Sequence, residues 1–230
     1  MRTICFRTVA TGVLALLAIA NAAAAQDSST LLSSLQVRQH VSSAQPADHA
    51  LLRDHFVALA GRYTADAGRH TAMAAAYVGN PNRGSAASPG AHCRRLTALA
   101  TESAATVREL AAHYGRLAEG IPSVAPRDGA RFEAGEGAPQ PTDQELRHAS
   151  AAARTPADHR GLEEHFAALA ARHTAEADEH VAMARAYRGN ANRRGGDPGV
   201  HCDRMAKQSR EAAEEARGVA AEHGRWAIIG

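Results

Sequence analysis

Hydrophobic side chains recur every three or four residues along the chain, which is the spacing of one face of an α-helix. In one stretch the recurring positions are Leu52, Phe56, Leu59, Tyr63, Asp66 or Ala67, His70, Met73 and Tyr77. A later stretch repeats the pattern with Leu162, Phe166, Leu169, His173, Glu176 or Ala177, His180, Met183 and Tyr187. Both patterns set a few polar residues into a buried seam, so each predicts a long amphipathic helix.

A proline opens each predicted helix, because proline is favoured at the first helical position. These prolines are Pro46, Pro89, Pro156 and Pro198. Gly-Asn pairs at 79–80 and 189–190 suit the left-handed end of a helix. Two helices of similar length joined by a short polar loop predict an antiparallel hairpin over residues 46–118, and a second over residues 156–227.

The two hairpins are copies of one another. Aligning residues 46–83 with 156–193 gives 24 identities in 38 positions, and aligning 92–118 with 201–227 gives 11 in 27. With only two copies, a closed structure is favoured over a solenoid. We expect an all-α fold of two tandem long antiparallel helical hairpins, packed as a pseudo-two-fold four-helix bundle. An elongated pair of independent hairpins is the alternative, since Ala-rich seams bury modest area.

The segments outside the hairpins predict export and flexible connections. Residues 1–25 have the charged start, apolar run and small-residue end of a signal peptide, so we expect cleavage near Ala25 and a periplasmic or secreted protein. Residues 26–45 form an N-terminal segment with room for a short helix, and residues 119–155 form a Gly/Pro-rich linker with room for another. No later segment reaches the roughly 20 apolar residues of a membrane span.

Composition and motifs argue against several classes of function. The 26 basic and 24 acidic residues nearly balance, and no basic stripe interleaved with aromatic residues indicates nucleic-acid binding. Aromatic residues make up only 4% of the chain, which leaves little material for a deep aromatic pocket. Phosphate-binding, hydrolase, metalloprotease and c-type haem motifs are absent from the sequence. We therefore expect a protein that is not an enzyme.

Eight potential metal ligands stand at matched positions near the predicted loops. They are His70, Met73, His92 and Cys93 in the first copy, and His180, Met183, His201 and Cys202 in the second. An antiparallel hairpin brings the end of its first helix level with the start of its second. If both loops lie at the same end of the bundle, all eight side chains converge there.

Imidazole, thioether and thiolate together favour copper, particularly Cu(I), whereas zinc accepts His and Cys but seldom Met. The sequence therefore predicts an exported metal-binding protein that sequesters or buffers copper, with zinc the less favoured ion and no protein partner identified.

Structural roles for the same residues remain open. Cys93 and Cys202 are equivalent by the duplication, and a disulfide between them would staple a non-catalytic interaction or chaperone-like module. Buried methionines are commonly core filler. Arg62 and Arg172 each stand one turn before an acidic residue, Asp66 and Glu176, and predict ion pairs within their own helices.

Overall fold

The chain folds into helices alone over the residues that the computed structural model describes, which are 31–78, 89–120, 141–189 and 198–229. The helices are α2 (Ser34–Val41), α3 (Pro46–Val78), α4 (Pro89–Leu117), α5 (Asp143–Ala152), α6 (Pro156–Gly189) and α7 (Pro198–Ile229). This confirms the predicted all-α class. None of the helices in the described ranges combines the length and hydropathy needed to cross a bilayer.

The four long helices begin at the four predicted prolines. Thr155 caps α6 as its sequence position suggests: its hydroxyl accepts from the Asp158 amide at 3.2 Å, and the Asp158 carboxylate accepts from the Thr155 amide at 2.9 Å. Both hairpin loops, residues 121–140 of the linker and the predicted signal peptide lie outside the described residues.

The short helices α2 and α5 show that the repeated unit is larger than the hairpin. Each begins with a capping box, formed by Ser33 with Gln36 and by Thr142 with Glu145. The two boxes stand 109 residues apart, which is also the offset between α4 and α7. Each short helix buries one apolar residue at the equivalent place, Val37 or Leu146. The unit is therefore one short helix followed by two long ones.

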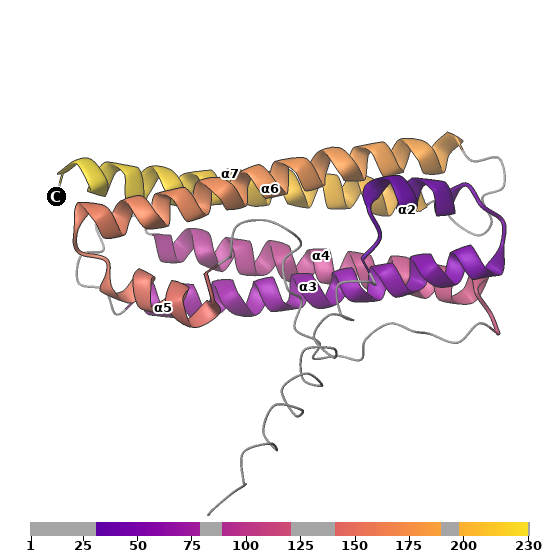
Figure 1. The fold of residues 1–230 in the computed structure, drawn as a ribbon, viewed down its shortest axis with the longest axis horizontal. Coiled ribbons are helices and arrows are strands. Elements are labelled where there is room, and N and C mark those ends of the chain that lie inside the picture. Colours follow the sequence, from indigo (N-terminus) through magenta and orange to yellow (C-terminus); the bar gives the residue numbers. More distant parts are fainter. Residues whose placement is uncertain (1–30, 79–88, 121–140, 190–197, 230) are drawn as a thin grey trace, which may run out of the picture.

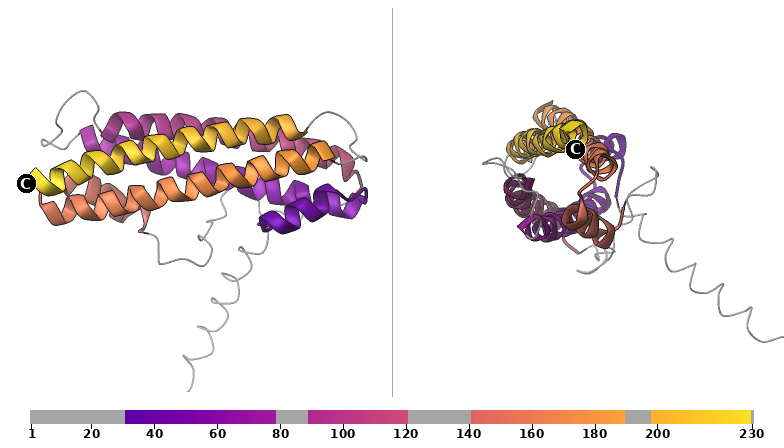
Figure 2. Two further views of the ribbon diagram at one scale, coloured as in Figure 1. Left: turned by 90° about the horizontal axis from the view of Figure 1, so that it is seen from above. Right: turned by 90° about the vertical axis from the view of Figure 1, so that its left-hand side faces the viewer.

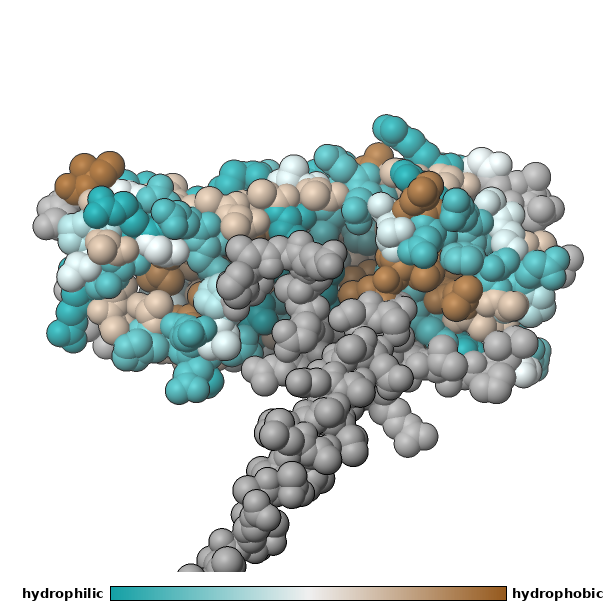
Figure 3. Space-filling view, viewed as in Figure 1, coloured by the Kyte–Doolittle hydropathy of each residue, from teal (hydrophilic) through white to brown (hydrophobic). Residues whose placement is uncertain are grey.

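The long helices pack in sequential pairs, α3 with α4 and α6 with α7, and the pairs meet through α4 and α7 (Figures 1 and 2). Helices α3 and α6 have little direct contact, and α2 and α5 lie between them, each touching both. The space-filling view of this face shows hydrophobic side chains gathered near α2 (Figure 3). These contacts are compatible with the predicted hairpins.

Two core clusters show how the pairs are oriented. In the Phe56 cluster, the open end of the first pair (Leu52, Phe56, Leu59, Leu110, Tyr114) packs on the loop end of the second (Met183, Ala184, Tyr187, Cys202, Met205). In the Phe166 cluster, the loop end of the first pair (Met73, Ala74, Tyr77, Cys93, Leu96) packs on the open end of the second (Phe166, Leu169, Ala216, Val219, Ala220). The loop ends therefore lie at opposite ends of the molecule.

Our expectation that both loops share one end is wrong. A reciprocal pair of hydrogen bonds accompanies the observed orientation: Tyr77 contacts His223 at 2.8 Å, and Tyr114 donates to Tyr187 at 2.7 Å. The orientation also packs the Phe56 and Tyr114 rings of one open end against the smaller Ala184 and Cys202 of the opposite loop end. Large side chains meeting small ones fill a core without voids.

Candidate functional site

The eight predicted ligands do not form one site. Met73 and Cys93 belong to the Phe166 cluster, whereas Met183 and Cys202 belong to the Phe56 cluster at the other end. His70 and His180 stay with their own copies, since each lies one turn before its methionine on the same helix. The predicted convergence of eight ligands is therefore wrong, because it required the two loops to meet.

His92 and His201 each lie beside a carboxylate of the opposite pair, and of the two contacts the one made by His92 is a hydrogen bond. The Nδ1 atom of His92 lies 2.6 Å from Glu215, and the Nδ1 atom of His201 lies 3.1 Å from Glu109. The His92 ring packs over Gly218, where a Cβ atom would come within 2.8 Å of it. Both histidines thus serve the α4–α7 contact, and we assign neither to a metal site.

The two cysteines form no disulfide. Both side chains are fully buried, and they belong to the separate core clusters at the two ends of the molecule. The alternative prediction of a Cys93–Cys202 staple is wrong for the same reason as the convergent site. If the protein is an interaction module, its fold must therefore be stable without this disulfide.

Thiol counting tests this arrangement directly. With Cys5→Ser to remove the third cysteine, we expect the native protein to react very slowly with Ellman's reagent, and two thiols to react on denaturation without any reductant. Burial raises the pKa of Cys93 to about 12, and the thiolate is the reactive form. Denatured protein that yields thiols only after reduction would contradict the structure.

A cavity of about 270 Å³ lies between α2, α3 and α6 near the second copy's ligands. We call it the His180 cavity; its polar lining is Ser34, His55, Arg62, Tyr63, Arg172, Glu176, Glu179 and His180. His180 is 5% exposed, and its Nδ1 atom is buried without a hydrogen-bond partner. Met183, one turn further along α6, also lines the cavity. His180, with its unpartnered ring nitrogen, and Met183 therefore line the same cavity.

Ion pairs between charged side chains of α3 and α6 connect the two copies at the His180 cavity. Arg62 pairs with Glu176, and Arg172 lies 3.4 Å from Asp66. The expected ion pair within one helix is wrong for Arg62, which pairs with Glu176 of α6 and not with Asp66. For Arg172 the expectation holds in part, because its Nε atom lies 3.8 Å from Glu176 of its own helix. Helices α3 and α6 stand too far apart for backbone packing, so long side chains bridge them.

The Glu176 carboxylate stays ionised at the centre of this network. Burial alone would raise its pKa, but a hydrogen bond with His173 and the positive charges of Arg62 and Arg172 hold the pKa at about 2. The Glu176 carboxylate is therefore already engaged by Arg62 and Arg172.

His55 lines the His180 cavity, and a hydrogen bond fixes its tautomer. Its Nδ1 atom accepts a hydrogen bond from the Leu32 amide at 3.0 Å. Burial lowers the pKa of His55 to about 4, so at neutral pH the ring is uncharged and its proton sits on Nε2. In a metal-bound histidine one ring nitrogen binds the metal and the other normally donates a hydrogen bond, whereas Nδ1 of His55 accepts one. His55 is therefore a hydrogen-bond donor to the cavity rather than a metal ligand.

The first copy offers much less space. Its equivalent cavity, about 60 Å³, is lined by Arg69, His70, His165, Ala168, Leu169 and Arg172. The Nδ1 atom of His70 also lacks a hydrogen-bond partner, but Met73 does not line this cavity and is fully buried. The two copies are thus unequal, and the second has the more accessible His-Met pair.

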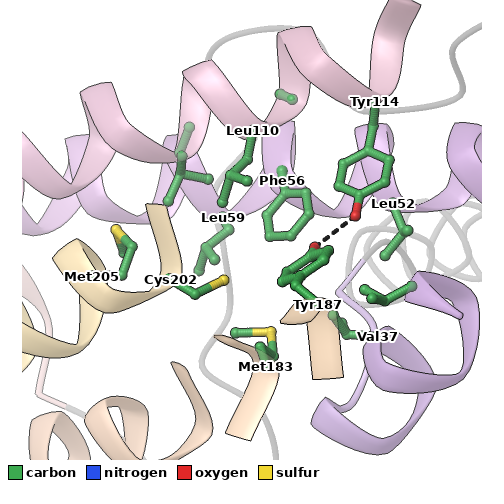
Figure 4. Packing of buried hydrophobic residues seen from close by; sticks show 14 of the residues in the cluster. Val37, Leu52, Phe56, Leu59, Leu110, Tyr114, Met183, Tyr187, Cys202 and Met205 are labelled. Carbon is green, nitrogen blue, oxygen red and sulfur yellow. Dashed lines mark hydrogen bonds between the residues drawn. The ribbon is translucent and has the colours of Figure 1, made fainter. Parts of the chain in front are cut away.

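The second copy also has a sulfur atom that our ligand selection missed. Met205 is fully buried in the Phe56 cluster with Met183 and Cys202 (Figure 4). It stands three residues after Cys202 on α7, so the two share a helix face. The only signal in the sequence was this Cys-x-x-Met spacing.

The comparisons with known proteins give no match. Protein-family models, curated proteins and solved structures were each compared with the chain, and none matches it. Within the described residues, no three His, Cys, Asp or Glu side chains are grouped so as to hold a metal ion.

Proposed function

We propose that this protein is an exported, non-catalytic copper-binding protein that holds Cu(I) through His180, Met183 and Cys202. The observation that carries the proposal is that His180, whose buried Nδ1 atom has no hydrogen-bond partner, lines the same cavity as Met183. Cys202 joins Met183 in the Phe56 cluster. Our proposed fold is a pseudo-two-fold four-helix bundle whose short helices α2 and α5 fill the gaps between α3 and α6.

Ligand chemistry supports Cu(I) over other ions. Thioether and thiolate sulfur are soft ligands that favour Cu(I), while the nearby Glu176 carboxylate is already paired with Arg62. Zinc remains less favoured because it seldom accepts a thioether. The His180 cavity would provide the entry path that a buried metal site needs.

The duplication makes the first copy an internal control. His70, Met73 and Cys93 are the equivalent residues, but of these three only His70 lines the smaller cavity, whereas both His180 and Met183 line the larger one. We propose that copper binds the second copy in preference to the first.

A Cu(I) competition titration of the reduced protein against a chromogenic chelator tests the proposal. We expect one tightly bound Cu(I) ion per chain, which we call the tight equivalent, because one copy has the accessible ligand set. The variant His180→Asn, Met183→Leu, Cys202→Ser should lose that equivalent, since it removes all three donors while keeping side-chain size.

The matched control is His70→Asn, Met73→Leu, Cys93→Ser in the first copy. It imposes the same chemical changes on equally buried positions and should retain the tight equivalent. Circular dichroism and thermal unfolding establish that both variants fold. Wild-type affinity no better than micromolar, or equal loss of binding in both variants, would overturn the proposal.

A further inference from the structure

The two copies differ at one buried position beside the cysteine. Met205 of α7 corresponds to Leu96 of α4, and both side chains are almost completely buried, with exposed fractions of 0% and 1%. Met205 packs in the Phe56 cluster, and Leu96 packs at the equivalent place in the Phe166 cluster. The fold thus places a thioether in one copy where the other has only hydrocarbon.

We infer that Met205 is a further copper ligand and that it makes the second copy the high-affinity site; this inference rests on the proposed function. Cys202 and Met205 project from the same face of α7, and Met183 approaches from α6 (Figure 4). The second copy can therefore offer three sulfur atoms, whereas the first offers those of Met73 and Cys93 alone.

The chemistry of binding follows from this donor set. The Cys202 thiol loses its proton to solvent as the sulfur–copper bond forms, and the two thioethers coordinate through lone pairs without losing a proton. One proton is released for each Cu(I) bound at this site, with no change in oxidation state. His180 completes the set from the side of the cavity, where its Nδ1 atom has no other partner.

Reciprocal substitutions test the role of Met205. Met205→Leu converts the second copy to the pattern of the first, and Leu96→Met does the reverse. Leu and Met have similar volumes, so both variants should fold with little change in stability. We expect Met205→Leu to weaken the tight Cu(I) equivalent about tenfold or more, and Leu96→Met to strengthen binding at the first copy so that a second equivalent becomes measurable.

X-ray absorption at the copper edge provides an independent readout. The wild-type site should show three sulfur neighbours and Met205→Leu two, while the control Met73→Leu should leave both the affinity and the sulfur count of the tight equivalent unchanged. Unchanged affinity and sulfur count in Met205→Leu would show that Met205 is core filler and overturn this inference alone. Absence of tight Cu(I) binding in the wild type would instead overturn the proposed function.

Discussion

Acidification from pH 7 to about pH 4.5 is expected to unfold this protein. Burial lowers the pKa of five histidines well below the usual 6.5: to about 4 for His55, His165 and His180, and to about 3 for His70 and His223. An unfolded chain binds these protons near pH 6.5, and the folded chain only near pH 3 to 4. Stability is therefore full above pH 6.5 and falls as the pH drops towards the folded-state values.

The expected size is large. Each shift of two to three units corresponds to roughly 3 kcal/mol between pH 6.5 and pH 4. Five such histidines together approach the total stability of a typical domain, which is about 5–15 kcal/mol. Urea unfolding followed by circular dichroism at intervals from pH 7.5 to 4.5 measures the effect.

A double variant separates this mechanism from general acid sensitivity. Replacing His70 and His180 with Gln should reduce the steepness of the pH dependence by nearly two protons at pH 5, even if the variant is less stable at pH 7. The exposed His148 provides the control, and His148→Gln should keep the wild-type slope. A pH dependence unaffected by the double variant would show that other groups control acid unfolding.

Phe56→Ala is expected to lower the free energy of unfolding by about 3–5 kcal/mol, the usual loss for a large ring removed from a close-packed core. Phe56 is 0% exposed and stacks on Tyr114 with ring centroids 5.7 Å apart. Its cluster contains residues of both helix pairs, so the cavity would weaken the contact between the copies as well as the first pair itself. Chemical denaturation at pH 7.5 measures the loss.

The duplication again supplies a comparison. Phe166 is equally buried at the equivalent position, and Phe166→Ala should give a loss of the same order. Leu51 is 42% exposed, and Leu51→Ala should change the free energy of unfolding by less than about 0.5 kcal/mol. Two separate unfolding transitions in Phe56→Ala, with the second pair keeping its full stability, would show that the copies fold independently.

The candidate site shows where reasoning from the sequence succeeded and where it failed. His180 and Met183 were selected because residues three apart share a helix face, and both line one cavity. His92 and His201 were selected for their height along the hairpin alone. Height does not fix direction around the helix axis, and both rings instead contact carboxylates of the opposite pair.

The sequence by itself determined the helices and their duplication. Periodicity, opening prolines and capping residues act within a few residues, so α3, α4, α6 and α7 begin where these signals stand. The relative orientation of the two pairs was decided only in the tertiary structure. Both copies carry similar apolar seams, and the observed orientation pairs Tyr77 with His223 at one end and Tyr114 with Tyr187 at the other, contacts between residues that are distant in the chain. That orientation separates Cys93 from Cys202, because packing between distant segments, unlike helix formation, has no local signal in the chain.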